Sequence, residues 1–235
     1  MVSPLGRVAL KWMPVALGLG VLAAFVGYRL YQRARERAPG VTRGTPISAP
    51  ALEGKSPDDL RNRLGVAMSL RDAQTAERLA EQLSRGGDEV LPGLARLLLW
   101  LDPVPPEPIF NVVLKYFRPR PMAMAVIMEV SKTQWVGIGP APRKLRILIA
   151  RGILLHSKDL EPAIDLNALL GARFDQASRP DGRLGLALVA AHLKLDGWER
   201  LARGALAQVQ DMESREELIQ AVAEGFGKER AASLR

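Results

Sequence analysis

The chain has 235 residues, with 33 basic and 25 acidic side chains, a net charge of +8 and an isoelectric point near 10.2. An apolar fraction of 48% excludes a chain that is disordered throughout. An aromatic fraction of 5% disfavours all-β folds and RNA readers that stack bases, and the absence of cysteine excludes disulfides, thiolate metal sites and cysteine nucleophiles.

The first predicted element is a transmembrane helix. Residues 12–28 carry no charge and span roughly 26 Å as a helix, and apolar residues on both sides extend this length toward a ~30 Å hydrocarbon core. We therefore predict a short flank over 1–11 and a membrane anchor over 12–31. A signal peptide cleaved near residues 21–23 and a buried core helix are the alternatives. Residues suited to the membrane boundaries are Lys11, Trp12, Tyr28, Arg29, Tyr31 and Arg33.

Charges beside this helix predict its orientation. Four arginines follow it within residues 29–37, whereas Arg7 and Lys11 precede it, so the positive-inside rule places the C-terminal part in the cytoplasm. Small residues recur within the span at a spacing that lets two helices approach closely. They predict a homo-oligomer through the membrane helix, with packing positions Ala16, Gly20, Ala24 and Gly27. The alternative is that alanine and glycine are simply common in membrane helices.

Residues 32–56 form a basic juxtamembrane segment and a linker rich in proline and glycine. Its end, Gly54-Lys55-Ser56, has the spacing of a phosphate-binding loop that starts at Ala49. Such a loop needs a buried strand before it, and prolines at 46 and 50 exclude a central strand here. We interpret Ser56 instead as the N-cap of a helix that begins at Pro57.

The remaining chain, 57–235, is predicted to be an all-α interaction domain of about ten short helices. Apolar spacing and stop signals place helices near 57–70, 72–85, 88–101, 107–117, 121–131, 143–156, 164–174, 183–195 and 214–226, with one more between the last two. Asp72 is predicted to cap the second of these helices, and Asp196 the one that follows 183–195. Residues 122–130 are also compatible with a strand. The most apolar segments, 145–155 and 183–195, are expected in the centre of the core.

The paired helices of residues 72–101, joined by a Gly-Gly-Asp turn, resemble a HEAT-type repeat. The sequence Glu-Arg-Leu-Ala at 77–80 recurs at 199–202, an offset of three units of roughly 41 residues. The resemblance implies a helical-hairpin array, either a solenoid or a compact domain, that binds proteins and catalyses no reaction. It departs from the family pattern at 103–108 and 134–142, where the period is lost.

No catalytic, cofactor-binding or metal-ligating residues are predicted. His156 and His192 lack an acidic residue or second histidine at ligand spacing, and we interpret both as histidines at the core edge. Methionines at 122, 124 and 128 are interpreted as core fillers, and no Gly-x-Ser-x-Gly motif occurs. The sequence therefore predicts a protein that is not an enzyme and uses no cofactor.

The charge is concentrated in two places. Residues 1–55 have a net charge of +6, and residues 115–158 hold nine basic side chains and one acidic one. This second block predicts contact with anionic lipid or an acidic protein, and nucleic acid is disfavoured because the rest of the domain is acidic. The alternative is a solvated face that neighbouring acids neutralise. The binding candidates are Lys115, Arg118, Arg120, Arg143, Lys144, Arg146, Arg151 and Lys158.

Together these features predict a single-pass membrane protein whose helical domain acts as a scaffold, an adaptor or an accessory subunit of a membrane complex. An accessory or regulatory subunit of an enzyme is the first alternative. An extracytoplasmic helical domain behind an anchor or signal peptide is the second.

Overall fold

The computed structural model describes residues 56–235, which contain helices and connecting loops and no strand. The predicted membrane anchor, its boundary residues, its packing positions and most of the linker lie outside these described residues. No helix within 56–235 combines the length and apolar character that crossing a membrane requires. The all-α prediction for the C-terminal domain is confirmed.

Eleven α-helices and one short 3₁₀ helix, at Gly87–Val90, make up the described part of the chain. The α-helices are α2 (Pro57–Ser69), α3 (Ala73–Ser84), α4 (Leu91–Trp100), α5 (Glu107–Leu114), α6 (Pro119–Lys132), α7 (Pro140–Leu160), α8 (Leu166–Gln176), α9 (Pro180–Leu193), α10 (Trp198–Leu206), α11 (Met212–Phe226) and α12 (Lys228–Ala232).

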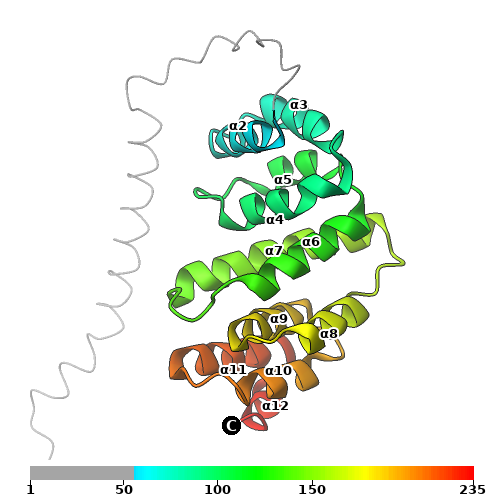
Figure 1. Ribbon diagram of the computed structural model, residues 1–235. Coiled ribbons are helices and arrows are strands. Elements are labelled where there is room, and N and C mark those ends of the chain that lie inside the picture. The colour runs from blue at the N-terminus through cyan, green and yellow to red at the C-terminus, as the bar shows by residue number, and fades with distance from the viewer. Residues whose placement is uncertain (1–55) are drawn as a thin grey trace, which may run out of the picture. The chain divides into compact units, whose positions relative to one another are not determined.

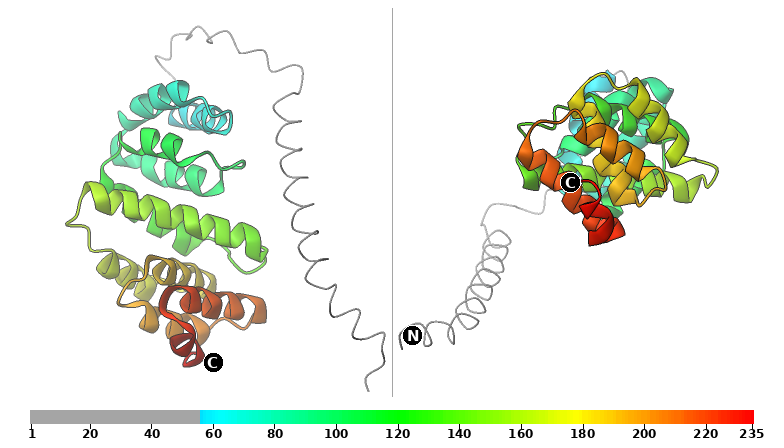
Figure 2. Two further views of the ribbon diagram at one scale, coloured as in Figure 1. Left: turned by 180° about the vertical axis from the view of Figure 1, so that it is seen from behind. Right: turned by 90° about the horizontal axis from the view of Figure 1, so that it is seen from below.

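Consecutive helices stack in pairs that follow one another in chain order (Figure 1). The first helices of the pairs form one row, in which α2 packs on α4, α4 on α6 and α6 on α8. The second helices form the other row, in which α3 packs on α5, α7 on α9 and α9 on α11. The view from behind in Figure 2 shows the same succession of layers.

Local sequence explains where several helices begin. The side chains of Ser56 and Asp72 accept hydrogen bonds from the backbone N–H groups of Asp59 and Thr75, at 3.2 and 3.1 Å. These bonds satisfy donors that the first turn of a helix leaves free, so both predicted N-caps are confirmed. Hydrogen bonds from the side chain and then the backbone of Thr75 lower the pKa of the Asp72 carboxyl.

The centre of the core lies around α9. Its residues 184–191 are all buried, which confirms the expectation from their nearly unbroken apolar sequence. Helix α9 packs against α6, α7, α8, α10 and α11, so five neighbours surround it. A helix enclosed in this way needs apolar side chains on every face.

The helix predicted over 121–131 is confirmed as α6, so the strand alternative for 122–130 does not apply. Two local predictions need correction. Helix α7 begins before the predicted residue 143, because Pro140 occupies its first turn, and it also extends past the predicted end at 156. Asp196 does not cap the next helix, which starts at Trp198 after Gly197 with no side-chain cap. The short helix α12 was not predicted.

The recurring Glu-Arg-Leu-Ala sequence does not mark a structural period. Its first copy lies in α3, the second helix of the first pair, and its second copy lies in α10, the first helix of the fifth pair. The two copies therefore occupy different rows. The first helices of the pairs begin at unequal intervals, at Pro57, Leu91, Pro119, Leu166 and Trp198.

Candidate binding groove between α5 and α7

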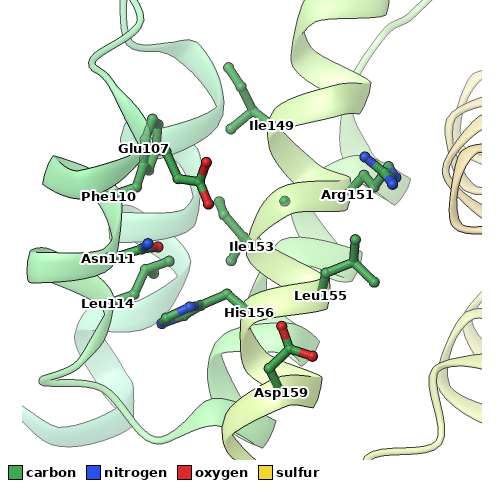
Figure 3. Close-up of a pocket in the computed structure, with 11 residues that line it drawn as sticks. Glu107, Phe110, Asn111, Leu114, Ile149, Arg151, Ile153, Leu155, His156 and Asp159 are labelled. Atoms are coloured by element: carbon green, nitrogen blue, oxygen red, sulfur yellow. The ribbon is translucent and has the colours of Figure 1, made fainter.

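The second row of helices opens between α5 and α7. Helix α7 packs closely on α4, α6, α9 and α11, whereas its approach to α5 is looser. The opening is a groove of about 420 Å³, shown in Figure 3. From here on it is called the α5–α7 groove, and its lining residues are Glu107, Phe110, Asn111, Leu114, Ile149, Arg151, Gly152, Ile153, Leu155, His156 and Asp159.

The two helices differ in length, and this difference shapes the groove. Prolines crowd the segment before α5, which then forms only eight residues of helix, whereas α7 has 21. The floor is made of apolar side chains from both helices, among them Phe110, Leu114 and Ile153 (Figure 3). Gly152 leaves space between them, because a Cβ atom added there would meet no atom within 4 Å.

The apolar face of α7 continues beyond the groove toward the start of the helix. Leu145 and Leu148 lie seven residues before Gly152 and Leu155, so they share the same helical face. Their exposures are 41% and 38%, high for leucines of a helix in the middle of the stack. The second row thus presents an apolar stripe that no described helix covers.

Polar groups lie at the two ends and in the middle of the groove. Figure 3 shows the Glu107 carboxylate at one end, Asp159 at the other, and Asn111 and His156 between them. Neither Glu107 nor Asp159 forms a salt bridge within residues 56–235. The Nε2 atom of His156 is buried and has no hydrogen-bond partner among the described residues.

The one basic side chain that lines the groove is turned away from it. Arg151 donates a hydrogen bond from Nε to the carbonyl oxygen of His192 at 3.0 Å, which directs its guanidinium toward α9 (Figure 3). The groups that face the groove are therefore two carboxylates, the amide of Asn111 and the imidazole of His156.

The other histidine, His192, lies in α9 and does not line the groove. Burial lowers the pKa of His192, and nearby Lys144 and Arg151 oppose its protonation further.

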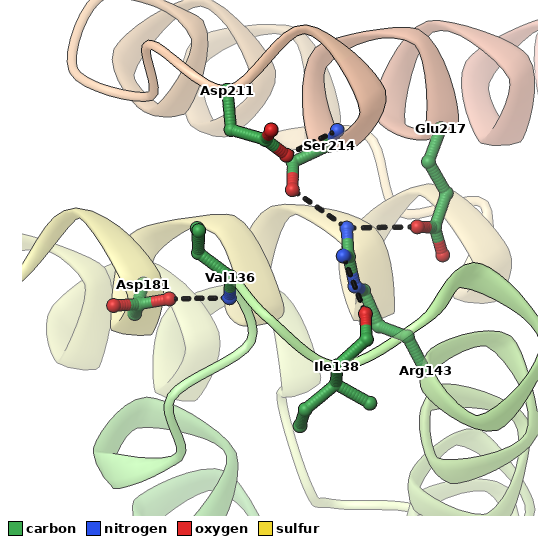
Figure 4. A network of polar contacts seen from close by, with 7 residues as sticks. All are labelled: Val136, Ile138, Arg143, Asp181, Asp211, Ser214 and Glu217. Carbon is green, nitrogen blue, oxygen red and sulfur yellow. Dashed lines mark hydrogen bonds and ion pairs between the residues drawn. The ribbon is translucent and has the colours of Figure 1, made fainter.

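The prediction that Arg143 and Arg146 bind an anionic partner needs correction, because both side chains are buried and bond to groups inside the domain. The Arg143 side chain is 1% exposed and forms an ion pair with Glu217 at 2.9 Å (Figure 4). Arg146 donates to the carbonyl oxygen of Leu101 at 3.1 Å and is 8% exposed. A buried guanidinium cannot contact a membrane or a large partner.

Three of the other six predicted basic residues lie near a carboxylate of a neighbouring helix. Lys115 pairs with Glu77, Arg118 pairs with Asp88, and Lys144 lies 3.2 Å from Glu224. Hydrogen bonds from Lys115 and Tyr116 lower the pKa of Glu77.

Arg120 and Lys158 are exposed and form no salt bridge with the rest of 56–235. The eight predicted residues thus form no continuous free basic face. Their arrangement favours the alternative that neighbouring acids neutralise the block.

Sequence reasoning missed the α5–α7 groove. The available signal was the spacing of Leu145, Leu148 and Leu155, which repeats on one face of a helix interpreted as fully buried. Within the described residues, no group of three or more acidic or histidine side chains is placed to hold a metal ion. No protein-family model, curated protein or solved structure matches this chain.

Proposed function

We propose that this protein is a non-catalytic scaffold or adaptor, held at a membrane by residues 12–31, that binds a partner protein through its stack of helix pairs. The uncharged segment between Lys11 and Arg29 supports the anchor. The observation that carries the binding role is the α5–α7 groove, an apolar opening in a row of helices that is otherwise closely packed.

The stacked pairs support a HEAT-like classification of the domain. Proteins built from such pairs expose long rows of parallel helices, and these rows serve as binding surfaces. Exposed apolar side chains such as Leu145 and Leu148 support a protein partner rather than solvent alone. We assign the binding surface to the groove and not to the basic residues, because acids on neighbouring helices pair with four of those eight and they form no continuous free face.

The direct test is affinity purification of the full chain from detergent-solubilised membranes, beside a variant that lacks residues 1–37. The proposal expects a stoichiometric partner with both proteins and membrane association only with the full chain. Recovery of no stoichiometric partner by either protein would contradict the scaffold role. Soluble behaviour of the full chain without detergent would contradict the anchor.

Membrane orientation is tested with a single cysteine in a chain that otherwise has none. Ser178 is exposed and suits this purpose, so the variant is Ser178→Cys. If the domain is cytoplasmic, a membrane-impermeant maleimide labels this cysteine only after cell lysis. Labelling of intact cells would place the domain on the outer side.

A further inference from the structure

We infer that the α5–α7 groove binds an amphipathic helix of a partner protein that carries lysine or arginine at both ends of its apolar face. This inference rests on the proposed scaffold function and specifies the partner's chemistry. It depends on three features of the groove: its apolar floor, its polar groups and the sign of the charge at its ends.

The apolar floor fits side chains that extend from one face of a helix. Phe110 and Leu114 lie on the α5 side, and Ile149, Ile153 and Leu155 lie on the α7 side. The open space above Gly152 can accept one large apolar side chain between them. The α5 side is about 12 Å long at ~1.5 Å per residue, enough for roughly two helical turns of a partner.

The scarcity of polar groups on the floor favours a helix over an extended peptide. A strand would bring unpaired backbone N–H and C=O groups into the groove, and burying such groups without hydrogen bonds is unfavourable. Between the two ends, the lining side chains that are polar and not directed away from the groove are Asn111 and His156. A helix satisfies its own backbone and presents only side chains, as in other complexes where a helix binds a groove.

The charge at the ends selects basic flanks. Glu107 and Asp159 are exposed, lie at opposite ends and have no cationic partner among the described residues. Arg151, which would oppose a basic partner, directs its guanidinium toward His192. Complementary rim charges fix the position and orientation of a bound helix more than they raise its affinity.

The His156 imidazole adds a polar contact within the floor. Its Nε2 is buried without a partner, and Figure 3 shows the ring directed toward α5. A buried polar atom of this kind is unfavourable unless it gains a hydrogen bond. A serine, threonine or glutamine on the apolar face of the partner helix would supply that bond.

The test uses the full chain in neutral phosphatidylcholine nanodiscs and fluorescein-labelled peptides of about 18 residues. One peptide has leucine at heptad a and d positions with lysine at both ends, the second has glutamate in place of lysine, and the third has serine in place of leucine. Fluorescence anisotropy, with empty nanodiscs as the blank, should show binding of the lysine peptide. The glutamate peptide should bind about tenfold more weakly, and the serine peptide not at all.

Two variants separate the groove from other surfaces. Gly152→Trp fills the open space and should abolish binding of the lysine peptide. Glu107→Lys combined with Asp159→Lys should reverse the preference toward the glutamate peptide. Glu89→Lys combined with Asp196→Lys, an equal change of charge outside the groove, should not. Unchanged binding by Gly152→Trp or an unchanged preference in the double variant would overturn the inference.

The outcome is distinguishable from failure of the scaffold role. If the peptides do not bind but Gly152→Trp still recovers a stoichiometric partner, the groove inference fails and the scaffold proposal stands. If the peptides behave as expected but purification recovers no partner, the groove inference stands and the scaffold proposal fails. The thermal unfolding midpoint of Gly152→Trp verifies folding, and the charge variants test the inference even if that variant unfolds.

Discussion

Two glycines show how differently the stack is closed along its second row. Gly185 lies in α9, where an added Cβ would sit 2.1 Å from Nε1 of Trp135. Gly152 lies in α7, where an added Cβ would meet nothing within 4 Å. A glycine allows close packing at the first position and leaves an opening at the second. The first junction is thus a packed core, and the second is a surface available for binding.

The closed junction is held by the loop that connects α6 to α7. Trp135 in this loop is 1% exposed, and its Nε1 donates to the carbonyl oxygen of Val130 at 2.9 Å. Val136 N–H donates to the carboxylate of Asp181 at 2.7 Å, which joins the loop to the start of α9 (Figure 4).

Arg143 extends the closed junction to α11. Its Nη1 lies 2.7 Å from Ser214 Oγ and 2.9 Å from Glu217 Oε2, and its Nη2 donates to the carbonyl oxygen of Ile138 at 2.7 Å (Figure 4). One buried guanidinium therefore connects α7, the preceding loop and α11. Burial raises the pKa of Glu217, and the positive charge of Arg143 partly counteracts this effect.

Removing this cation should give the largest loss of stability. Arg143→Met leaves Glu217 half-buried without its cation, so we expect the free energy of unfolding to fall by about 3 kcal/mol. Without Arg143 the folded-state pKa of Glu217 rises further above its ordinary value of 4.5. The folded protein then binds the proton more tightly than the unfolded chain, so the loss increases as pH rises above that value.

Urea-induced unfolding at pH 4 and pH 7 measures both effects. The adjacent Lys144→Met is the control, because Lys144 pairs with Glu224 at the surface and its removal should change stability by less than about 1 kcal/mol. Equal losses for the two variants would show that the buried contact of Arg143 has no special role in closing the junction.

A methyl group at Gly182 should have the next largest effect. An added Cβ there would lie 2.2 Å from the backbone oxygen of Ser131, and backbone cannot move aside as a flexible side chain can. Gly182→Ala should therefore lower the free energy of unfolding by about 2 kcal/mol, measured by urea titration. Gly171→Ala is the control, because its nearest neighbour is the end of the Arg200 side chain, at 3.0 Å. Equal stability of the two variants would contradict tight packing of α6 against α9.

Sequence patterns predicted the helices well because the signals that start and stop them are local. Ser56 and Asp72 act on N–H groups three residues away, so their roles can be inferred without a fold. The α10 start was wrong because two turn-forming residues, Asp196 and Gly197, adjoin there, and the local pattern does not distinguish them.

The candidate site was harder to predict because it depends on which helices become neighbours. A cluster of basic residues in the sequence gives the net charge of a segment but does not identify the partner of each side chain. The partner of Arg143, Ser214, lies 71 residues away in the sequence, and the partner of Lys144, Glu224, lies 80 residues away. An apolar run in α7 likewise predicts burial on all faces. Whether α5 closes over Gly152 depends on packing between separate pairs.

Loss of the Asp211 carboxylate should weaken the closed junction less than loss of Arg143. Asp211 accepts a hydrogen bond from the backbone N–H of Ser214 at 2.9 Å. Hydrogen bonds with the side chain and then the backbone of Ser214 lower the pKa of Asp211 below its ordinary value of 3.8. Its contribution is therefore present above pH 3.8 and is lost as pH falls through the lower folded-state pKa. Asp211→Ala should lower the midpoint of thermal unfolding at pH 7 and leave it nearly unchanged at pH values below the folded-state pKa of Asp211. A loss that is independent of pH would exclude the capping role.

The smallest expected change is a gain of stability at the open junction. Gly152→Ala places a methyl group where no described atom lies within 4 Å and replaces a poor helix former with the best one. The free energy of unfolding should rise by about 0.5–1 kcal/mol in urea titration of the protein without a bound partner. A fall in stability would mean that another segment already covers Gly152 and that the groove is closed. A gain would confirm that the two glycines serve opposite purposes, one for packing within the chain and one for leaving space beside α5.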